Sequence, residues 1–312
     1  MNKNGGFLGT LFLILSLVAV GYSAYYLYQN IPRESINLVN TNSQQITTTN
    51  TIPSKQFYDN MRYSDRTINY HISESCPENK ANRTKEALDT IEAKTVLIFN
   101  PVSKPNSVLN ILCSDISPEA EEENHFVAGE GGPSRVLNST LYSVILEGKV
   151  ALYREGTCNN ANVAIHELLH ALGFDHNNNR RSILYPTLEC DQEIDQEIID
   201  SINELYGVES LPDLTFDKVN ATKSGRYLNF HIEVLNRGLI SANNAVVGIY
   251  ADNKFIETFD LNTISIGAKK IIDVGNLKVP LNAENIEFVI DYGEEIAELY
   301  ENNNKIALMN TI

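Results

Sequence analysis

The sequence has few basic residues for its length and no run of them. Its 312 residues include 24 Lys and Arg against 40 Asp and Glu, which gives a formal charge of −16 at pH 7. A protein that binds the phosphate backbone of nucleic acid needs clustered Lys and Arg, so we exclude nucleic acid as a partner. The hydrophobic share of 43% and the charged share of 21% are typical of a globular chain with room for two domains.

Cysteine is scarce and never occurs with the C-x-x-C spacing of a cysteine zinc site. We therefore do not expect cysteine to bind zinc. An even number of cysteines in an exported chain indicates disulfides instead, and four cysteines allow three pairings. The four are Cys76, Cys113, Cys158 and Cys190.

Charge is absent from residues 7–28, where Leu, Ile, Val, Ala and aromatic residues dominate. At the rise of an α-helix this stretch is long enough to cross the hydrocarbon core of a bilayer. Lys3, in the short tail 1–6, favours a cytoplasmic N-terminus with the rest of the chain outside. We predict a single-pass signal anchor with interfacial aromatics at its outer end: Tyr22, Tyr25, Tyr26 and Tyr28. A signal peptide cleaved near residues 19–21 stays open, and the protein would then be secreted.

The next segment, 29–62, is poor in large apolar side chains and rich in Asn, Ser, Thr and Gln from about residue 40 to 51. This composition predicts a flexible linker that holds the following domain away from the membrane. An ordinary polar loop is the alternative.

The strongest pattern in the chain is H-E-L-L-H-A-L-G-F-D-H at 166–176. Histidines at i and i+4 project from one face of a helix, so His166 and His170 can bind the same metal ion. Gly173 suits the left-handed residue that ends such a helix and turns the chain back, which brings His176 to the metal as a third ligand. Three protein ligands leave one tetrahedral position open for water, as in a catalytic zinc site, and Glu167 can handle a proton on that water. A core helix with incidental histidines is the bland alternative.

This pattern resembles H-E-x-x-H-x-x-G-x-x-H of the metzincin zinc peptidases. In the matrixin branch a turn of the form x-x-Met-Tyr-Pro lies beneath the zinc ligands. Here Tyr185 and Pro186 match that turn, while Leu184 stands in place of Met. Leu and Met have similar volumes, so we expect Leu184 to pack beneath the zinc ligands as Met does in the family. Two further departures are Leu169, where Gly is common, and Asn177, where Ser is common.

The resemblance implies one catalytic Zn²⁺, a protein or peptide substrate, and a general base. The base would be Glu167, and the zinc ligands would be His166, His170 and His176. Tyr185 would line the specificity pocket below the zinc, although packing under the site is an equal alternative. Many matrixins are kept latent by a propeptide thiol on the zinc, and no cysteine lies between the anchor and the catalytic domain to play that part. The sequence makes no prediction about structural Ca²⁺ or oligomeric state.

We place the metzincin-like catalytic domain at 63–208. The periodicity predicts a strand at 67–72, a helix at about 77–94, strands at 96–99 and 107–114, a glycine-rich turn at 129–133, a β-hairpin with strands 141–146 and 150–153, and a closing helix at 192–206. The fold class is α+β. We expect a mixed sheet with helices on one face, and the zinc helix is one of these helices. An extended substrate would bind by its backbone along an edge strand within 136–146.

The positions of the cysteines favour one of the three pairings. Cys158 lies just before the zinc helix and Cys190 lies just after the Tyr-Pro turn, so a bond between them would clamp the loop with all three histidines. Cys76 paired with Cys113 would tie the first helix to a central strand. The other two pairings stay open.

From residue 211 to 312 the period changes from helical to alternating, as in 227–236, and strand-like runs follow at the spacing of a β-sandwich. The closing run at 291–304 resembles the end of the CARDB family, which are immunoglobulin-like, adhesion-related modules. His231 falls within the alternation and is expected to be structural. The module could serve as a spacer, a substrate-docking module or a surface-attachment module, because fold alone assigns no ligand.

Taken together, the sequence predicts a membrane-anchored, externally facing zinc endopeptidase that cleaves extracellular or cell-surface proteins. Two alternatives from other classes stay open. One is a catalytically weak or inactive protein that binds its partner without cutting it. The other is a cell-surface adhesion protein whose C-terminal domain carries the main function.

Overall fold

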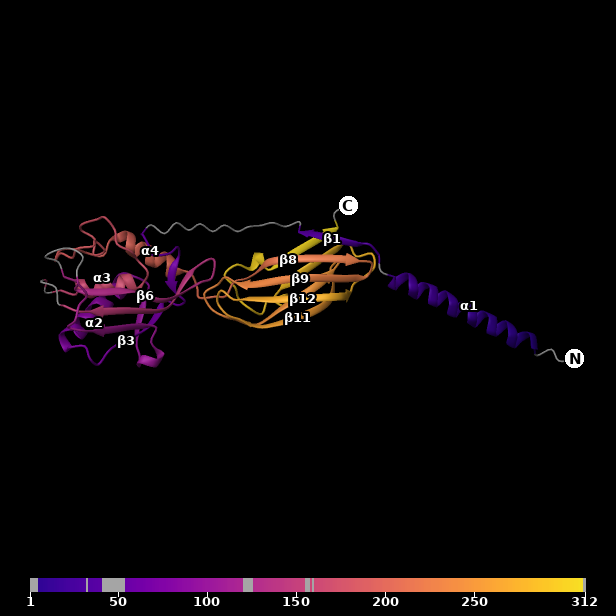
Figure 1. The fold of residues 1–312 in the computed structure, drawn as a ribbon, viewed down its shortest axis with the longest axis horizontal. Coiled ribbons are helices and arrows are strands. Elements are labelled where there is room, and N and C mark those ends of the chain that lie inside the picture. Colours follow the sequence, from indigo (N-terminus) through magenta and orange to yellow (C-terminus); the bar gives the residue numbers. More distant parts are fainter. Residues whose placement is uncertain are drawn as a thin grey trace.

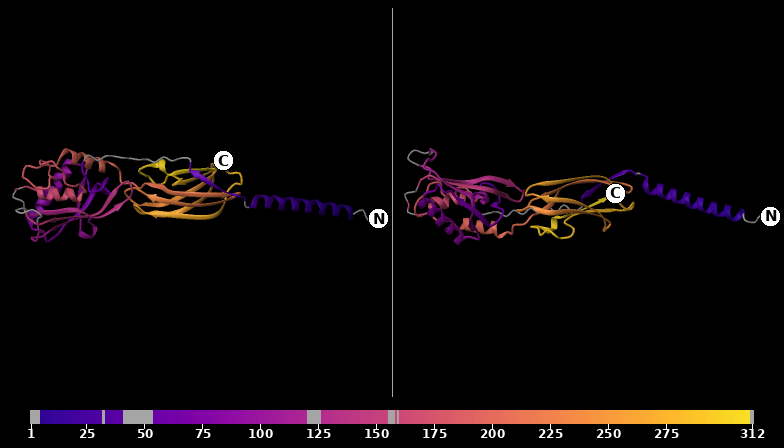
Figure 2. Two further views of the ribbon diagram at one scale, coloured as in Figure 1. Left: turned by 45° about the horizontal axis from the view of Figure 1, so that its top comes forward. Right: turned by 90° about the horizontal axis from the view of Figure 1, so that it is seen from below.

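The structure is a computed structural model that describes residues 5–31, 33–40, 54–119, 126–154, 158 and 160–310. The molecule is elongated (Figures 1 and 2). A single helix, α1 (Gly5–Asn30), lies at one end, a domain of mixed helices and strands lies at the other, and an all-β domain lies between them.

The helix α1 is apolar all round, and its side chains are exposed from residue 9 to residue 28. Residues Gly9–Asn30, with a mean hydropathy of 1.8, are long and apolar enough to cross a membrane. A signal sequence near an N-terminus has the same properties. The length and composition of the helix fit both a membrane span and a signal sequence.

The mixed domain is built on a six-stranded sheet with the order β2-β7-β5-β3-β4, to which β6 adds by pairing with β7. Only β6 runs antiparallel to its neighbour. The helix α3 packs against β6, β7 and α2. The elements are β2 (Met61–Tyr63), β3 (Thr67–Ile72), α2 (Glu78–Lys94), β4 (Ile98–Pro101), the 3₁₀ turn η1 (Lys104–Asn106), β5 (Leu109–Cys113), β6 (Gly129–Asn138), β7 (Ser143–Leu152), α3 (Asn162–Ala171) and α4 (Gln196–Gly207).

Two sequence predictions in this domain were wrong. Residues 129–133 do not form a turn but begin β6, and 147–149 do not turn a hairpin but lie inside β7. Gly131 and Gly148 are needed because other parts of the chain lie too close to their Cα atoms for a side chain. A Cβ on Gly131 would lie 1.9 Å from the backbone oxygen of Glu167, and one on Gly148 would lie 2.1 Å from Tyr63 Oη. The β6–β7 turn lies instead at 139–142, where Ser139 N–H donates to the Tyr142 carbonyl over 2.9 Å.

The second domain is one antiparallel sheet of eight strands, in the order β11-β10-β13-β14-β1-β8-β9-β12. The sheet folds over on itself, because the Phe230 ring of β9 lies 5.1 Å from the Phe288 ring of β13. Its elements are β1 (Ser35–Asn40), β8 (Leu214–Ser224), β9 (Tyr227–Asn236), β10 (Ala242–Ala251), β11 (Lys254–Ile264), β12 (Lys269–Lys278), β13 (Asn285–Ile290), the 3₁₀ turn η2 (Glu301–Asn303) and β14 (Lys305–Asn310).

The prediction of a flexible linker over 29–62 was wrong at both ends. Ser35–Asn40 forms β1, which pairs with β8 on one side and β14 on the other, and Leu38 is buried there. Residues 54–62 belong to the mixed domain: Ser54 N–H donates to Ser201 Oγ over 3.1 Å, and Met61 is fully buried. A six-residue strand inside a polar segment gives too weak an alternation to stand out. The polar run 41–53 lies outside the described residues.

The disulfides have the favoured pairing. Cys76 bonds Cys113, which joins the start of α2 to β5, and Cys158 bonds Cys190. The second bond brackets the segment 166–176, so the loop that follows α3 is closed by a covalent link as well as by packing.

Candidate metal centre

The helix α3 presents His166 and His170 one turn apart and then ends in a glycine turn. Gly173 has a φ of +99°, its N–H donates to the His170 carbonyl, and Phe174 N–H donates to the Leu169 carbonyl. This pair of bonds is a Schellman motif, which satisfies the last carbonyls of the helix while the left-handed glycine reverses the chain. The reversal returns His176 to the face of the helix that carries the other two histidines.

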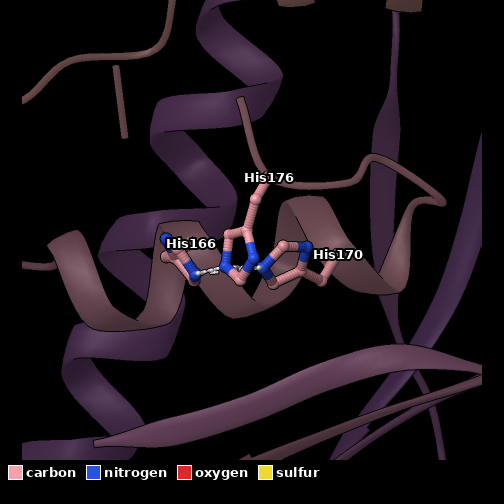
Figure 3. A group of neighbouring side chains, drawn as sticks. All are labelled: His166, His170 and His176. Carbon is pink, nitrogen blue, oxygen red and sulfur yellow. Dashed lines mark hydrogen bonds between the residues drawn. The ribbon is translucent and has the colours of Figure 1, made fainter. Parts of the chain in front are cut away.

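The three imidazoles converge on one point (Figure 3). Their Nε2 atoms lie 3.0 Å apart between His166 and His170, 3.1 Å between His170 and His176, and 3.2 Å between His166 and His176. Four ligands at a zinc–nitrogen distance of 2.0–2.1 Å in a tetrahedron lie about 3.3 Å from one another. The observed spacing therefore fits a small tetrahedral metal ion.

The other ring nitrogens are fixed by backbone carbonyls. His166 Nδ1 donates to Ile183 O over 2.6 Å, and His170 Nδ1 donates to Phe174 O over 2.7 Å. A carbonyl can only accept, so each neutral ring carries its proton on Nδ1 and points the Nε2 lone pair at the common centre. Lone pairs held this close repel unless a cation lies between them. The donor set therefore fits a resident metal.

The electrostatics keep the rings neutral. Burial, together with the neighbouring histidine, lowers the pKa of His166 to about 3. Burial also lowers the pKa values of His170 and His176. His166 and His170 are buried and His176 is exposed, so the centre opens towards solvent on the side of His176. Neutral imidazole is the form that binds metals.

Glu167 belongs to α3, and it lies against the first residues of β6. It is buried, the backbone N–H of Gly131 donates to its carboxyl group, and the missing side chains of Gly129 and Gly131 leave it room. Burial, with Glu130 nearby, raises the pKa of Glu167 to about 8. A carboxyl group with a pKa near neutrality can both accept and return a proton. The sequence identified Glu167 but missed these two glycines, which look like turn residues until the strand is known.

The turn at 182–186 lies beside the histidines. Leu184 is buried, and its carbonyl accepts from Asn177 N–H over 3.0 Å. The carbonyl of the preceding Ile183 is the one that fixes His166. Tyr185 is half-buried and Pro186 is exposed. The turn therefore orients one imidazole directly, while Tyr185 keeps part of its surface free.

Asn177 gains a role that its departure from the family pattern did not suggest. Its side-chain amide donates to Ser182 Oγ over 2.7 Å and to Asp195 Oδ2 over 3.1 Å. The residue next to His176 is thereby tied both to the turn and to the start of α4. A serine at this position is too short to make both bonds.

Residues 54–57 contact the loop that carries His176 and hold it in place. The sequence did not indicate this role, because these residues were predicted to lie in the linker. Gln56 forms a β-bridge with Phe174, and Lys55 Nζ lies 2.6 Å from Asp175 Oδ2. The ring of Phe57 lies 5.8 Å from that of His170. A cavity of about 400 Å³ beside His176 is lined by Ser54 and Lys55 together with Leu184 and Asp195.

Two protein families match separate regions of this chain. Residues 62–207 match the matrixin family, and residues 211–308 match the CARDB family. A search of the curated proteins found none that matches. Among solved structures, the crystal structure of a CARDB domain from Pyrococcus furiosus, in complex with di-metal ions, has 18% identity and a TM-score of 0.27, and the match covers 33% of this chain and 90% of that one. Matrixins are zinc metallopeptidases, and the histidine triad of that family is present here. The chain therefore joins a matrixin-like domain to a C-terminal domain that matches the CARDB family.

Proposed function

We propose that the protein is a zinc-dependent endopeptidase. The observation that carries the proposal is the convergence of three Nε2 lone pairs within 3.0–3.2 Å, in a domain that matches the matrixins. His166, His170 and His176 would hold Zn²⁺. When bound, the ion supplies a Lewis acid that polarises a peptide carbonyl and makes water a stronger acid.

The chain's own residues supply orientation and proton transfer. Glu167 accepts the proton of the attacking water and returns it to the nitrogen of the leaving amine, acting first as general base and then as general acid. The N–H of Gly131 holds the carboxyl group in place for both steps. The bonds from Nδ1 to Ile183 O and Phe174 O fix the two helix imidazoles. Such outer hydrogen bonds orient ligands and raise their basicity.

The substrate would bind along the free edge of β6. This strand pairs with β7 on one side, and no other strand in the described part of the chain pairs with its second edge. An extended peptide can add there through backbone hydrogen bonds. The expected region, 136–146, needs correction, because 143–146 belong to β7 and lie between β2 and β6. Only its first residues are at the edge. The half-exposed Tyr185 is our candidate for contact with a substrate side chain.

We further infer that α1 is retained as a membrane anchor, with the domains outside the cell. The exposed apolar surface of α1 supports the anchor, and the two disulfides agree with an oxidising compartment. We also infer that the C-terminal domain is an immunoglobulin-like sandwich. Its support is a single core shared by the two halves of the folded sheet, with Phe230 against Phe288.

The test is cleavage of casein and of a peptide library by the full chain with bound zinc. We expect Glu167→Gln to lower the rate by about 10²–10⁴-fold while the zinc content is unchanged, because the residue moves protons and does not bind the metal. Glu204→Gln, an exposed glutamate on α4, is the matched control and should keep full activity. A zinc-loaded wild-type protein that cleaves nothing would favour the inactive binding protein. Unchanged activity of Glu167→Gln would remove the proposed base.

A further inference from the structure

The all-β domain is completed by a strand from the other end of the chain. β1 begins at Ser35, shortly after the apolar helix α1 ends at Asn30, and inserts between β8 and β14 in the middle of the eight-stranded path. The whole matrixin domain lies between β1 and β8 in the sequence. The domain that matches CARDB therefore consists of residues 211–310 together with 35–40, and its N-terminal strand is the segment that leads out of α1.

β1 pairs with β8 along its first four residues and with β14 along its last three, and the two pairings meet at Leu38. Ser35 pairs with Ser224 and Leu38 with Ala221 of β8, while Leu38, Val39 and Asn40 pair with residues 308–310 of β14. Leu38 is 9% exposed and belongs to the common core. Without β1, two neighbouring strands would present unpaired backbone groups to solvent, and the core would open at Leu38.

The residues just before β1 also contact this domain. The hydroxyl group of Ser224 donates to the Arg33 carbonyl. Gly225, at the left-handed turn between β8 and β9, lies against Arg33 and the Ile31 carbonyl. The contacts between the N-terminal segment and the sheet therefore include Ile31 and Arg33 as well as β1.

We propose that residues 33–40 are a strand clasp, and that the groove between β8 and β14 is its receptor. The chain is then held to α1 in two ways. One is covalent, through residues 41–53, and the other is non-covalent, through β1. A cut between β1 and the matrixin domain leaves both domains bound to the N-terminal fragment, because strand pairing on two sides and the burial of Leu38 replace the peptide link. This attachment does not depend on the peptidase activity.

The experiment uses the full chain in detergent micelles, with an N-terminal affinity tag and a site for a sequence-specific protease placed between residues 41 and 53. A Glu167→Ala background removes any self-cleavage. After complete cutting, the fraction of the C-terminal part that stays on the tag resin is measured. We expect most of it to remain. Its complete release from the unsubstituted chain would overturn the proposal.

Two substitutions in β1 separate the clasp from other contacts. Leu38→Asp places a charge in the core. The loss of a buried leucine should raise the dissociation constant between the two cut fragments by about 30-fold and so lower the fraction retained on the resin. Val39→Asp is the matched control, because Val39 is 48% exposed, and should leave retention unchanged. The uncut Leu38→Asp chain should remain bound through its covalent link. Equal retention of the cut Leu38→Asp and Val39→Asp chains would contradict the clasp.

A competition measurement on the unsubstituted chain removes any dependence on the folding of Leu38→Asp. A synthetic peptide of residues 33–40, present in excess during the cut, should occupy the groove and release the C-terminal part. A peptide of the same composition in scrambled order should not. Retention that the native peptide leaves unchanged would show that contacts other than β1 hold the fragments, and the proposal would fail.

Discussion

The two domains differ in how far along the chain their decisive contacts reach. In the matrixin domain, the three Nε2 atoms that meet within 3.2 Å all come from residues 166–176. In the C-terminal domain, β1 pairs with strands at 221–224 and 308–310. The ligands of the first arrangement come from one helix and one tight turn, whereas the second arrangement pairs strands from the two ends of the chain. Local geometry therefore brings the three histidines together, and long-range pairing completes the C-terminal domain.

The strongest test of this local character is the disulfide that closes the site. Replacing Cys158 and Cys190 by Ser, or Cys76 and Cys113 by Ser, should each cost about 4 kcal/mol of unfolding free energy, because the bridged separations of 32 and 37 residues are similar. Only the first pair brackets the histidines, so only its loss should also weaken zinc binding, by roughly tenfold. Urea unfolding and zinc titration measure both effects. Equal zinc affinities for the two double variants would show that the loop needs no covalent closure.

The contact between β6 and α3 is the next feature to test. Gly131→Ala places a Cβ 1.9 Å from the backbone oxygen of Glu167, and the forced shift should cost about 3 kcal/mol and lower activity. Gly132→Ala is the matched control, since no atom lies within 4 Å of its Cβ, and it should change stability by less than about 0.5 kcal/mol. Thermal unfolding with zinc present is the measurement. The same small loss from both variants would mean that the strand is not held against the helix.

In the C-terminal domain, a buried carboxyl group gives a test of pH dependence. Glu298 accepts from the backbone N–H of Leu214 and from Asn304 Nδ2, and burial raises the pKa of Glu298 to about 8. The folded state thus keeps a proton that the unfolded chain releases above its ordinary pKa of about 4.3. The stability that this proton contributes is fully present below that value and is lost as the pH rises towards 8.

Glu298→Gln should remove this dependence. Asn304 Oδ1 has no hydrogen-bond partner, so the Asn304 amide can turn and accept from the new glutamine. We expect melting temperatures of the two proteins to agree at pH 4, below the ordinary pKa, and the variant to be on the order of 5 °C more stable at pH 8. Differential scanning calorimetry at both pH values makes the comparison. A variant that is less stable at pH 8 would show that Glu298 is charged in the folded protein.

The smallest effect is expected from restoring the family residue beneath the histidines. Leu184 is buried, and Met has a similar volume, so Leu184→Met should change stability by less than about 1.5 kcal/mol. The Ile183 carbonyl that fixes His166 stays in place, so zinc content should not change. Thermal unfolding and metal analysis check this. A large gain in activity from Leu184→Met would mean that the leucine weakens the site.

Features set by short-range geometry could be predicted from the sequence. The spacing of His166, His170 and Gly173 defines a helix, its left-handed end and the return of the third ligand. The alternation at 227–236 corresponds to β9. The same reasoning failed where a residue serves a distant neighbour. Gly131 resembles a turn residue because the helix that needs its missing side chain comes 36 positions later, at Glu167. Similarly, Leu38 lies in a polar segment, and only the assembled sheet shows why it is apolar.

The central claim is that three imidazoles bind one metal ion with a position left open. X-ray absorption spectroscopy at the zinc edge of the purified full chain tests it most directly. The account predicts three imidazole nitrogens and one oxygen, all at about 2.0–2.2 Å, and the loss of one imidazole in His176→Ala. Fewer than three imidazoles in the wild-type protein, or sulfur at about 2.3 Å, would contradict it.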